Sequence, residues 1–303
     1  MKYNSLLSLT KAFPNEETCI KHLEQLRWPS GIVCPCCGRT RKIYKVKRSS
    51  IYKCGDCRKQ FSVRKGTIFE ESRLSLQKWF AAAWLVTSNR KGIASTQLSR
   101  EIGVTQKTAW FILGRLREVA KAMSSTGGPM NGDVEADETY IGGKESNKHA
   151  TKKTNAGRGI VGKQAILGAC ERGGRVTSYR AKGTTIADIH EFITGNVSPN
   201  SNLYTDDHAG YKGLKNYNHE SVNHSGKEYV RGKAHTNTIE SFWSLLKRGH
   251  YGIFHTISGK HLYRYLAEFE ARWNMNKMNG AERVDALLES SSGLRLDYKG
   301  LKA

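Results

Sequence analysis

Two pairs of cysteines constrain the first part of this chain more tightly than any other feature. Cys34/Cys37 and Cys54/Cys57 each have C-x-x-C spacing, and 16 residues separate the pairs. Two such pairs place four thiolates tetrahedrally around one ion, and Zn²⁺ suits four soft ligands in that geometry. The run between the pairs, RKIYKVKRSSIYKC, has the pattern of a β-hairpin, and RKQFSVRKGTIF after them resembles a further strand. The sequence therefore predicts a zinc ribbon that holds one structural zinc.

Three other cysteines lie outside these two pairs. Cys36 is the ambiguous thiol, because it is close enough in sequence to replace a neighbouring ligand. Cys19 and Cys170 stand alone in the sequence, and we expect both to be packing residues in the core.

Length, charge and hydropathy set the broad class. The chain has 303 residues, enough for two or three domains, and a formal net charge of +22. Such an excess predicts a polyanionic partner, most often nucleic acid. The longest apolar run, Trp79–Val86, is far shorter than the ~20 residues that span a membrane, and the N-terminus does not resemble a signal peptide. We therefore expect a cytoplasmic protein without disulfides.

A helix-turn-helix pattern follows the cysteines. Ile93, Leu98 and Ile102 mark the buried side of one helix. Gly103 lies where the turn needs a positive φ, and Thr105 caps the next helix. A plain pair of helices is the alternative to DNA binding. The residues expected to contact DNA from this region are Gln106, Lys107, Thr108 and Arg115.

The pattern of elements suggests an α+β protein of several domains. Residues 15–27 and 75–87 are predicted helices, with Asn15 as the cap of the first. From residue 133 onward, three strands, a helix, two strands and a helix are predicted, an order typical of an RNase H-like core with a mixed five-stranded sheet. A generic α+β domain is the alternative. The expected divisions are 1–70 (helix and zinc ribbon), 71–123 (helix-turn-helix), 124–132 (linker), 133–280 (core) and 281–303 (tail).

Three acids are placed where such a core would bring them together. Asp137 lies on the strand 133–143, Asp206 at the end of a later strand, and Glu240 on the helix of HTNTIESFWSLLKR. Strand alternation puts Glu135 on the same side as Asp137, and Glu138 on the other. Three converging carboxylates would repel one another unless cations shared the site, and their hard oxygens favour Mg²⁺ or Mn²⁺. Two such ions would support phosphodiester chemistry.

The helix offers an alternative third ligand. Asn237, Glu240 and Lys247 share one helix face, because they are spaced by three and seven residues. Asn237 is either an outer partner or itself a ligand, whereas Glu240 is preferred because an ionised carboxylate binds a divalent cation better. Lys247 either binds a phosphate or is solvated. Asp207 and Glu138 are the alternatives to their neighbours if the register slips by one residue.

In these motifs the chain resembles the bacterial insertion-sequence transposases that join an N-terminal zinc ribbon to a DDE integrase-like core. The resemblance is carried by RWPSGIVCPCCG, DETYIGGK, YTDDHAGY and HTNTIESFWSLLKRG. It implies that water attacks a phosphodiester at the transposon end and that the freed 3′-OH then attacks target DNA. It also implies that Asp137 and Asp206 are catalytic and that Lys247 matches the basic residue after the third position. That third position is an acid or Asn in the group.

The expected partners are double-stranded DNA, both transposon terminal repeats and target, and a second copy of the chain. This implies a bacterial, nucleoid-associated protein. The basic segment Lys144–Lys163 is poor in large apolar residues, so we expect a mobile loop that orders on DNA, with Lys152 and Lys153 as contacts. Two rival functions stay open: a DNA-binding regulator on a transposase-like scaffold, and a hydrolytic Mg-dependent nuclease that never joins strands.

Overall fold

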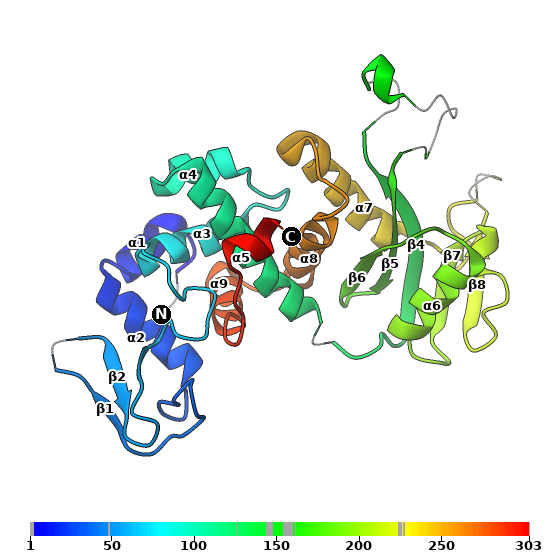
Figure 1. Ribbon diagram of the computed structural model, residues 1–303. Helices are drawn as coiled ribbons and strands as arrows, with labels where there is room; N and C mark the ends of the chain where they lie inside the picture. The colour runs from blue at the N-terminus through cyan, green and yellow to red at the C-terminus, as the bar shows by residue number, and fades with distance from the viewer. Residues whose placement is uncertain are drawn as a thin grey trace. The chain divides into compact units, whose positions relative to one another are not determined.

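The computed structural model describes residues 3–47, 49–125, 127–143, 148–153, 160, 162–223, 226 and 228–302. The chain divides into two compact units (Figure 1). Unit 1 is formed by Met1–Met123 together with Met275–Ala303, and unit 2 by Ser124–Asn274. Unit 2 is therefore an insertion in the sequence of unit 1.

Unit 1 combines a small sheet with helices. The sheet is antiparallel, in the order β1-β2-β3, with β1 at Ile43–Lys45, β2 at Ile51–Cys54 and β3 at Gln60–Ser62. This confirms the predicted ribbon hairpin and the strand after it. The helices before residue 125 are α1 (Leu6–Ala12), α2 (Glu16–Arg27), α3 (Leu76–Ser88), α4 (Ser95–Ile102) and α5 (Gln106–Ser124).

Local sequence explains where several of these helices begin and end. The side chains of Asn15, Ser75 and Thr105 each accept a hydrogen bond from the backbone N–H three residues later, at 3.0 to 3.4 Å. Gly103 ends α4 with a φ of +61°, as its place in the turn predicted. Among the helices of the described residues, none is both long and apolar enough to cross a membrane.

The C-terminal residues belong to unit 1 and differ from the predicted tail. They form α9 (Gly280–Glu289) and α10 (Tyr298–Lys302). Val284, Leu287 and Leu288 of α9 are buried in one hydrophobic cluster with residues of the ribbon and of helices α1 to α5. The segments 1–70 and 71–123, predicted as separate domains, thus share a core. The physical reason is size, since neither segment alone encloses enough apolar surface.

Unit 2 contains the predicted mixed five-stranded sheet. Its order is β6-β5-β4-β7-β8, in which β4, β5 and β6 pair antiparallel and β4, β7 and β8 pair parallel. The strands are β4 (Asp133–Ile141), β5 (Gln164–Glu171), β6 (Val176–Arg180), β7 (Asn202–Asp206) and β8 (Asn218–Val222). The helices are α6 (Ile186–Asn196), α7 (Asn237–Gly249) and α8 (Leu262–Asn274). Each forms at the predicted place.

Helices cover both faces of this sheet (Figure 1). On one face, Val134 and Ala136 of β4 pack with Ile189 of α6. On the other face, the hydrophobic cluster joins β5 and β6 to residues of α7 and α8, including Phe242 and Phe269. The odd-numbered residues of β4 therefore face α7, as the alternation along that strand predicted.

Part of the predicted basic loop lies outside the described residues. Residues 144–147, 154–159 and 161 of the segment Lys144–Lys163 fall there, so the expectation of a mobile loop stays a prediction. The described part includes a short 3-10 helix, Ala150–Lys152, whose side chains are exposed.

Side chains of α8 close the outer edge of the sheet at β6. Asn274 accepts the N–H of Val176 at 2.8 Å and donates to the carbonyl of the same residue at 3.1 Å. Glu270, one turn earlier, accepts the backbone N–H of Ser178 at 2.8 Å and the hydroxyl of Ser178 at 2.5 Å. An edge strand needs such cover to avoid pairing with another chain.

The edge contact makes stability depend on pH. Burial raises the pKa of the Glu270 carboxyl from 4.5 to about 7. Between these values the folded chain keeps a proton that the unfolded chain releases, so stability is full below pH 4.5 and falls as the pH rises to 7. The loss corresponds to ~3 kcal/mol. The measurement is the free energy of unfolding in urea, for wild type and Glu270→Gln, at pH 4.5 and at pH 8. Because glutamine does not titrate, we expect the stability of Glu270→Gln relative to wild type to be higher at pH 8 than at pH 4.5 by this amount. If the difference in unfolding free energy between the variant and wild type is the same at both pH values, Glu270 does not have a raised pKa.

Candidate functional site

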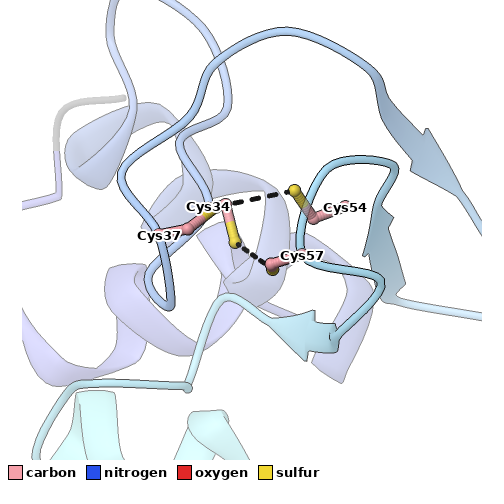
Figure 2. Close-up of side chains that lie close together, drawn as sticks. All are labelled: Cys34, Cys37, Cys54 and Cys57. Carbon is pink, nitrogen blue, oxygen red and sulfur yellow. Dashed lines mark hydrogen bonds between the residues drawn. The ribbon is translucent and has the colours of Figure 1, made fainter.

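The four predicted zinc ligands lie together in unit 1. Figure 2 shows Cys34, Cys37, Cys54 and Cys57 side by side on two loops of the ribbon. Two pairs of Sγ atoms are each 3.7 Å apart, and all four atoms lie within 4.8 Å of one another. Thiolates at the usual Zn–S distance of about 2.3 Å form a tetrahedron with an edge of about 3.8 Å. The residues therefore fit one zinc ion, and Cys36 is exposed outside the group.

Both cysteine loops are built on the same backbone plan. In each, the N–H of the first cysteine donates to the carbonyl of the residue five positions later, at 2.9 and 3.0 Å. The residue after the second cysteine has a left-handed conformation in both loops, with φ of +72° at Gly38 and +57° at Arg58. Glycine adopts this conformation without strain, whereas arginine does not. The loops thus bring the thiolates to one point through their backbone.

Acidic residues meet in unit 2, where β4 and β7 run side by side in parallel. Asp137 lies on β4, and Asp206 is the last residue of β7. Asp137, Glu138 and Asp206 each place a carboxylate oxygen within 4.8 Å of the others. Asp207, the alternative to Asp206, is exposed and is not part of this group. The sheet therefore brings together the two acids that the sequence favoured.

Burial and like charge both act on this acidic group. The pKa of the Asp137 carboxyl is raised to about 8, first by burial and then by the charges of Glu138, Asp206 and Glu240. Burial, followed by the charge of Asp206, also raises the pKa of Glu138. A divalent cation would remove this repulsion, and hard carboxylate oxygens suit Mg²⁺ or Mn²⁺. The donor set therefore fits a divalent cation.

Glu138 joins the group from an unexpected direction. Strand alternation turns its Cβ to the opposite face from that of Asp137. Its Oε2 accepts a hydrogen bond from the hydroxyl of Tyr211 at 3.1 Å, and its Oε1 lies 3.9 Å from Nε2 of His208. The sequence predicts Glu138 only as an alternative to Asp137, whereas the structure brings both acids to one place.

The first turn of α7 carries the candidates for the third ligand. Asn237 and Glu240 are both exposed. Glu240 accepts a hydrogen bond from the hydroxyl of Thr236 at 2.9 Å, and its charge contributes to the raised pKa of Asp137. Lys247 is half-buried near the other end of the helix. Glu240 is therefore the acid of α7 whose charge acts on Asp137, but it lies outside the group that Asp137 forms with Glu138 and Asp206.

A buried glutamate fixes the start of α7 against β4. Glu135 is fully buried, and its Oε2 accepts the backbone N–H groups of Thr238 and Ile239 at 2.7 and 3.0 Å. These N–H groups have no acceptor within the helix, and a negative charge at this end also suits the helix dipole. Arg172 donates to the same carboxylate through Nε at 2.8 Å. This role is not visible in the sequence, because only the fold brings the helix start to the strand.

The predicted DNA contacts are divided between the two units. At the start of α5, Gln106 and Lys107 are exposed and Thr108 is half-buried. The Gln106 amide donates to the hydroxyl of the first residue of α4 at 2.8 Å, which links the two helices of the turn. In unit 2, Lys152 and Lys153 are exposed. These positions are open to a ligand, and their contact with DNA stays a prediction.

The structure corrects the expected role of Arg115. Its side chain is buried, with 6% exposure. Its guanidinium donates to three backbone carbonyls, those of Ile68, Glu70 and Leu296. Arg115 lies on the inner side of α5 and ties distant segments of unit 1 together, so it is not available to DNA. A long arginine stem on a helix allows this inward path, which charge alone does not reveal.

Two protein families match the parts of the chain that contain the acidic group and the four cysteines. The sequence model of the ISXO2-like transposase domain family matches residues 129–274. The sequence model of the transposase zinc-ribbon domain family matches residues 14–60. A protein of Halobacterium salinarum, described as an uncharacterized protein in transposable element ISH50, is 30% identical over 300 residues, which cover 93% of this chain and 98% of that one. The crystal structure of the Mos1 strand transfer complex shares 10% identity, with 70% of this chain and 78% of that one covered, at a TM-score of 0.29. A TM-score this low supports no conclusion about the fold or function of this chain.

Proposed function

Because this chain belongs to the ISXO2-like transposase family, we propose that it binds the ends of a transposable element, cuts a phosphodiester there and joins the freed 3′ end to target DNA. The observation that carries this proposal is the acidic group on β4 and β7, which contains Asp137 and Asp206. Carboxylate oxygens are ligands that Mg²⁺ and Mn²⁺ prefer, and such ions support phosphodiester chemistry.

Asp137, Asp206 and Glu240 are the proposed ligands for Mg²⁺ or Mn²⁺. These residues would hold the ions through their carboxylate oxygens, and the bound ions would supply positive charge to the attacking and leaving oxygens of a phosphodiester. The two aspartates are held by the sheet, and Glu240 is held by a helix whose start is bound to β4. Asn237 is the alternative third ligand through its carbonyl oxygen. Glu240 is favoured because its charge acts on Asp137.

Other residues are proposed to bind DNA rather than metal. Lys247 follows Glu240 by two turns and would bind a phosphate near the reacting bond. The start of α5 would contact base edges from the helix-turn-helix. The zinc ribbon, whose segment RKIYKVKRSSIYKC is rich in lysine and arginine, would contact phosphates. A net charge of +22 supports extensive backbone contact. A dimer that holds two element ends is part of the proposal, as are a bacterial origin and a location at the nucleoid.

A strand-transfer assay tests the proposal. Zinc-loaded protein is given a labelled pre-cut end with a free 3′-OH, plasmid target and Mg²⁺, and joined products are counted. We expect wild type to join, Glu240→Gln to be inactive and Asn237→Ala to keep most of its activity. If Asn237→Ala is inactive while Glu240→Gln joins, the third ligand is the amide.

The same assay separates the rival functions. Nicked DNA without joined products, in Mg²⁺ and in Mn²⁺, would contradict the transposase proposal in favour of a hydrolytic nuclease. Tight binding to DNA with neither nicks nor joints would favour a regulator. The closeness of Asp137 and Asp206 argues against the regulator, since a binding protein has no need of a converged acidic group.

A further inference from the structure

One contact in unit 2 links the helix of the third acid directly to the first acid. The indole N–H of Trp243, on α7, donates to Oδ2 of Asp137 at 3.0 Å. Trp243 is 3% exposed, so its N–H must find a partner inside the protein. Asp137 thus has one carboxylate oxygen held by a rigid, buried donor. We propose that Trp243 is a positioning residue that fixes the Asp137 carboxylate for the cation.

A glycine makes room for this contact. Gly168 of β5 is the direct partner of Asp137 in the antiparallel register. A Cβ at Gly168 would lie 2.4 Å from Cη2 and 2.5 Å from Cζ2 of Trp243, and 3.3 Å from Cδ1 of Ile239. The indole ring therefore lies directly on the backbone of β5, beside Asp137. A side chain at position 168 would push the ring away from the carboxylate.

The helix that carries the indole is itself bound to β4. Glu135, two residues before Asp137 on the same face, accepts the N–H groups of Thr238 and Ile239. Two strand residues advance by about 6.6–6.8 Å. The four or five helix residues up to Trp243 advance by about 6–7.5 Å. The similar lengths let α7 contact Glu135 and Asp137 at once, so the helix cannot slide along the strand without breaking both contacts.

This arrangement has a chemical purpose in a metal site. A ligand carboxylate that rotates freely loses affinity, because binding must then also restrict it. Groups that orient a ligand typically contribute about 10–100-fold to metal affinity or activity. Trp243 supplies such orientation through one hydrogen bond and does not itself contact a cation. The inference rests on the proposed function only in taking Asp137 as a ligand, and it concerns binding rather than joining.

The test measures Mn²⁺ binding to the full-length, zinc-loaded protein by calorimetry, without DNA. Mn²⁺ leaves the thiolate site alone, because it prefers oxygen ligands. We expect Trp243→Phe, which keeps a ring and removes the donor, to weaken Mn²⁺ binding about 10-fold. Trp273→Phe is the matched control, since it makes the same change in the same hydrophobic cluster. The strand-transfer activity of Trp243→Phe should recover as the Mn²⁺ concentration is raised. An unfolded variant would not recover.

Further variants keep the proposal testable if Trp243→Phe folds poorly. A 1-benzothiophene analogue of tryptophan at position 243 keeps the two-ring shape and lacks the N–H, and it should show the same 10-fold loss. Gly168→Ala should weaken Mn²⁺ binding as well, by displacing the ring. Unchanged Mn²⁺ affinity in a folded Trp243→Phe or analogue protein overturns the proposal. The proposal is also overturned if the Asp137→Asn variant binds Mn²⁺ as tightly as wild type does. A wild type that binds Mn²⁺ through Asp137 but joins no DNA would overturn the proposed function alone.

Discussion

Replacing Asp206 with Asn is expected to abolish joining while leaving binding to transposon-end DNA intact. Asp206 lies in the acidic group with Asp137 and Glu138. A catalytic metal contributes several kcal/mol to the transition state, and each 1.36 kcal/mol is a factor of ten in rate. We therefore expect the rate of strand transfer to fall at least ~1,000-fold. The measurement is the initial rate of joining from a pre-cut end, with binding followed separately by gel shift.

The neighbouring aspartate provides a matched control. Asp207→Asn makes the same chemical change one position later, at an exposed residue outside the acidic group. Its joining rate should stay within a few-fold of wild type. The reverse result, with Asp207→Asn inactive and Asp206→Asn active, would show that Asp207 and not Asp206 is the ligand. Equal loss in both variants would point to a general effect on the loop.

Loss of zinc is expected to unfold the ribbon. A structural zinc site contributes ~10–16 kcal/mol in zinc-finger peptides at neutral pH, far more than so small a segment gains from packing. Cys54→Ser should therefore lose the ion and release the aromatic cluster of Trp28, Tyr52 and Phe61, whose rings are 5.8 to 6.0 Å apart. Zinc content by mass spectrometry and near-ultraviolet circular dichroism report the two effects.

Cys36→Ser is the control for this prediction. Cys36 is exposed and lies outside the four-cysteine group, so the variant should keep one zinc per chain and the wild-type near-ultraviolet spectrum. If Cys36→Ser lost the ion and Cys54→Ser kept it, the ligand set would be different from the one in the structure. Because Cys54 is part of the core of unit 1, Cys54→Ser should also lower the melting temperature of that unit.

The elements that local sequence patterns specify were predicted well. The ribbon strands, the helix caps and the five-stranded sheet follow from cysteine spacing, capping residues and alternation. The closeness of Asp137 and Asp206 could be predicted because both lie on strands whose pattern is clear. The sequence does not reveal the two contacts between β4 and α7, that of Glu135 with the start of the helix and that of Trp243 with Asp137. Glu135 and Trp243 act through partners more than a hundred positions away in the sequence, and no local pattern encodes such a pairing.

Long-range packing also explains the two errors of placement. The segment 281–303 resembles a tail when read alone, because its helices are short and gain their stability from residues near the N-terminus. Arg115 resembles a DNA contact for the same reason. Its three acceptors come from residues 68, 70 and 296, and an arginine whose acceptors are unknown looks like a free cation.

The division of unit 1 around unit 2 determines the order in which the protein is completed on the ribosome. Residues 124–274 emerge as a whole before residue 275, so unit 2 has all of its chain first. Unit 1 must wait, with the surface that will pack against Val284, Leu287 and Leu288 still uncovered. A chain released early, before α9, would therefore carry a complete unit 2 and an incomplete unit 1. Complete synthesis is thus a condition for the four-cysteine group and the acidic group to lie in two folded units of the same molecule.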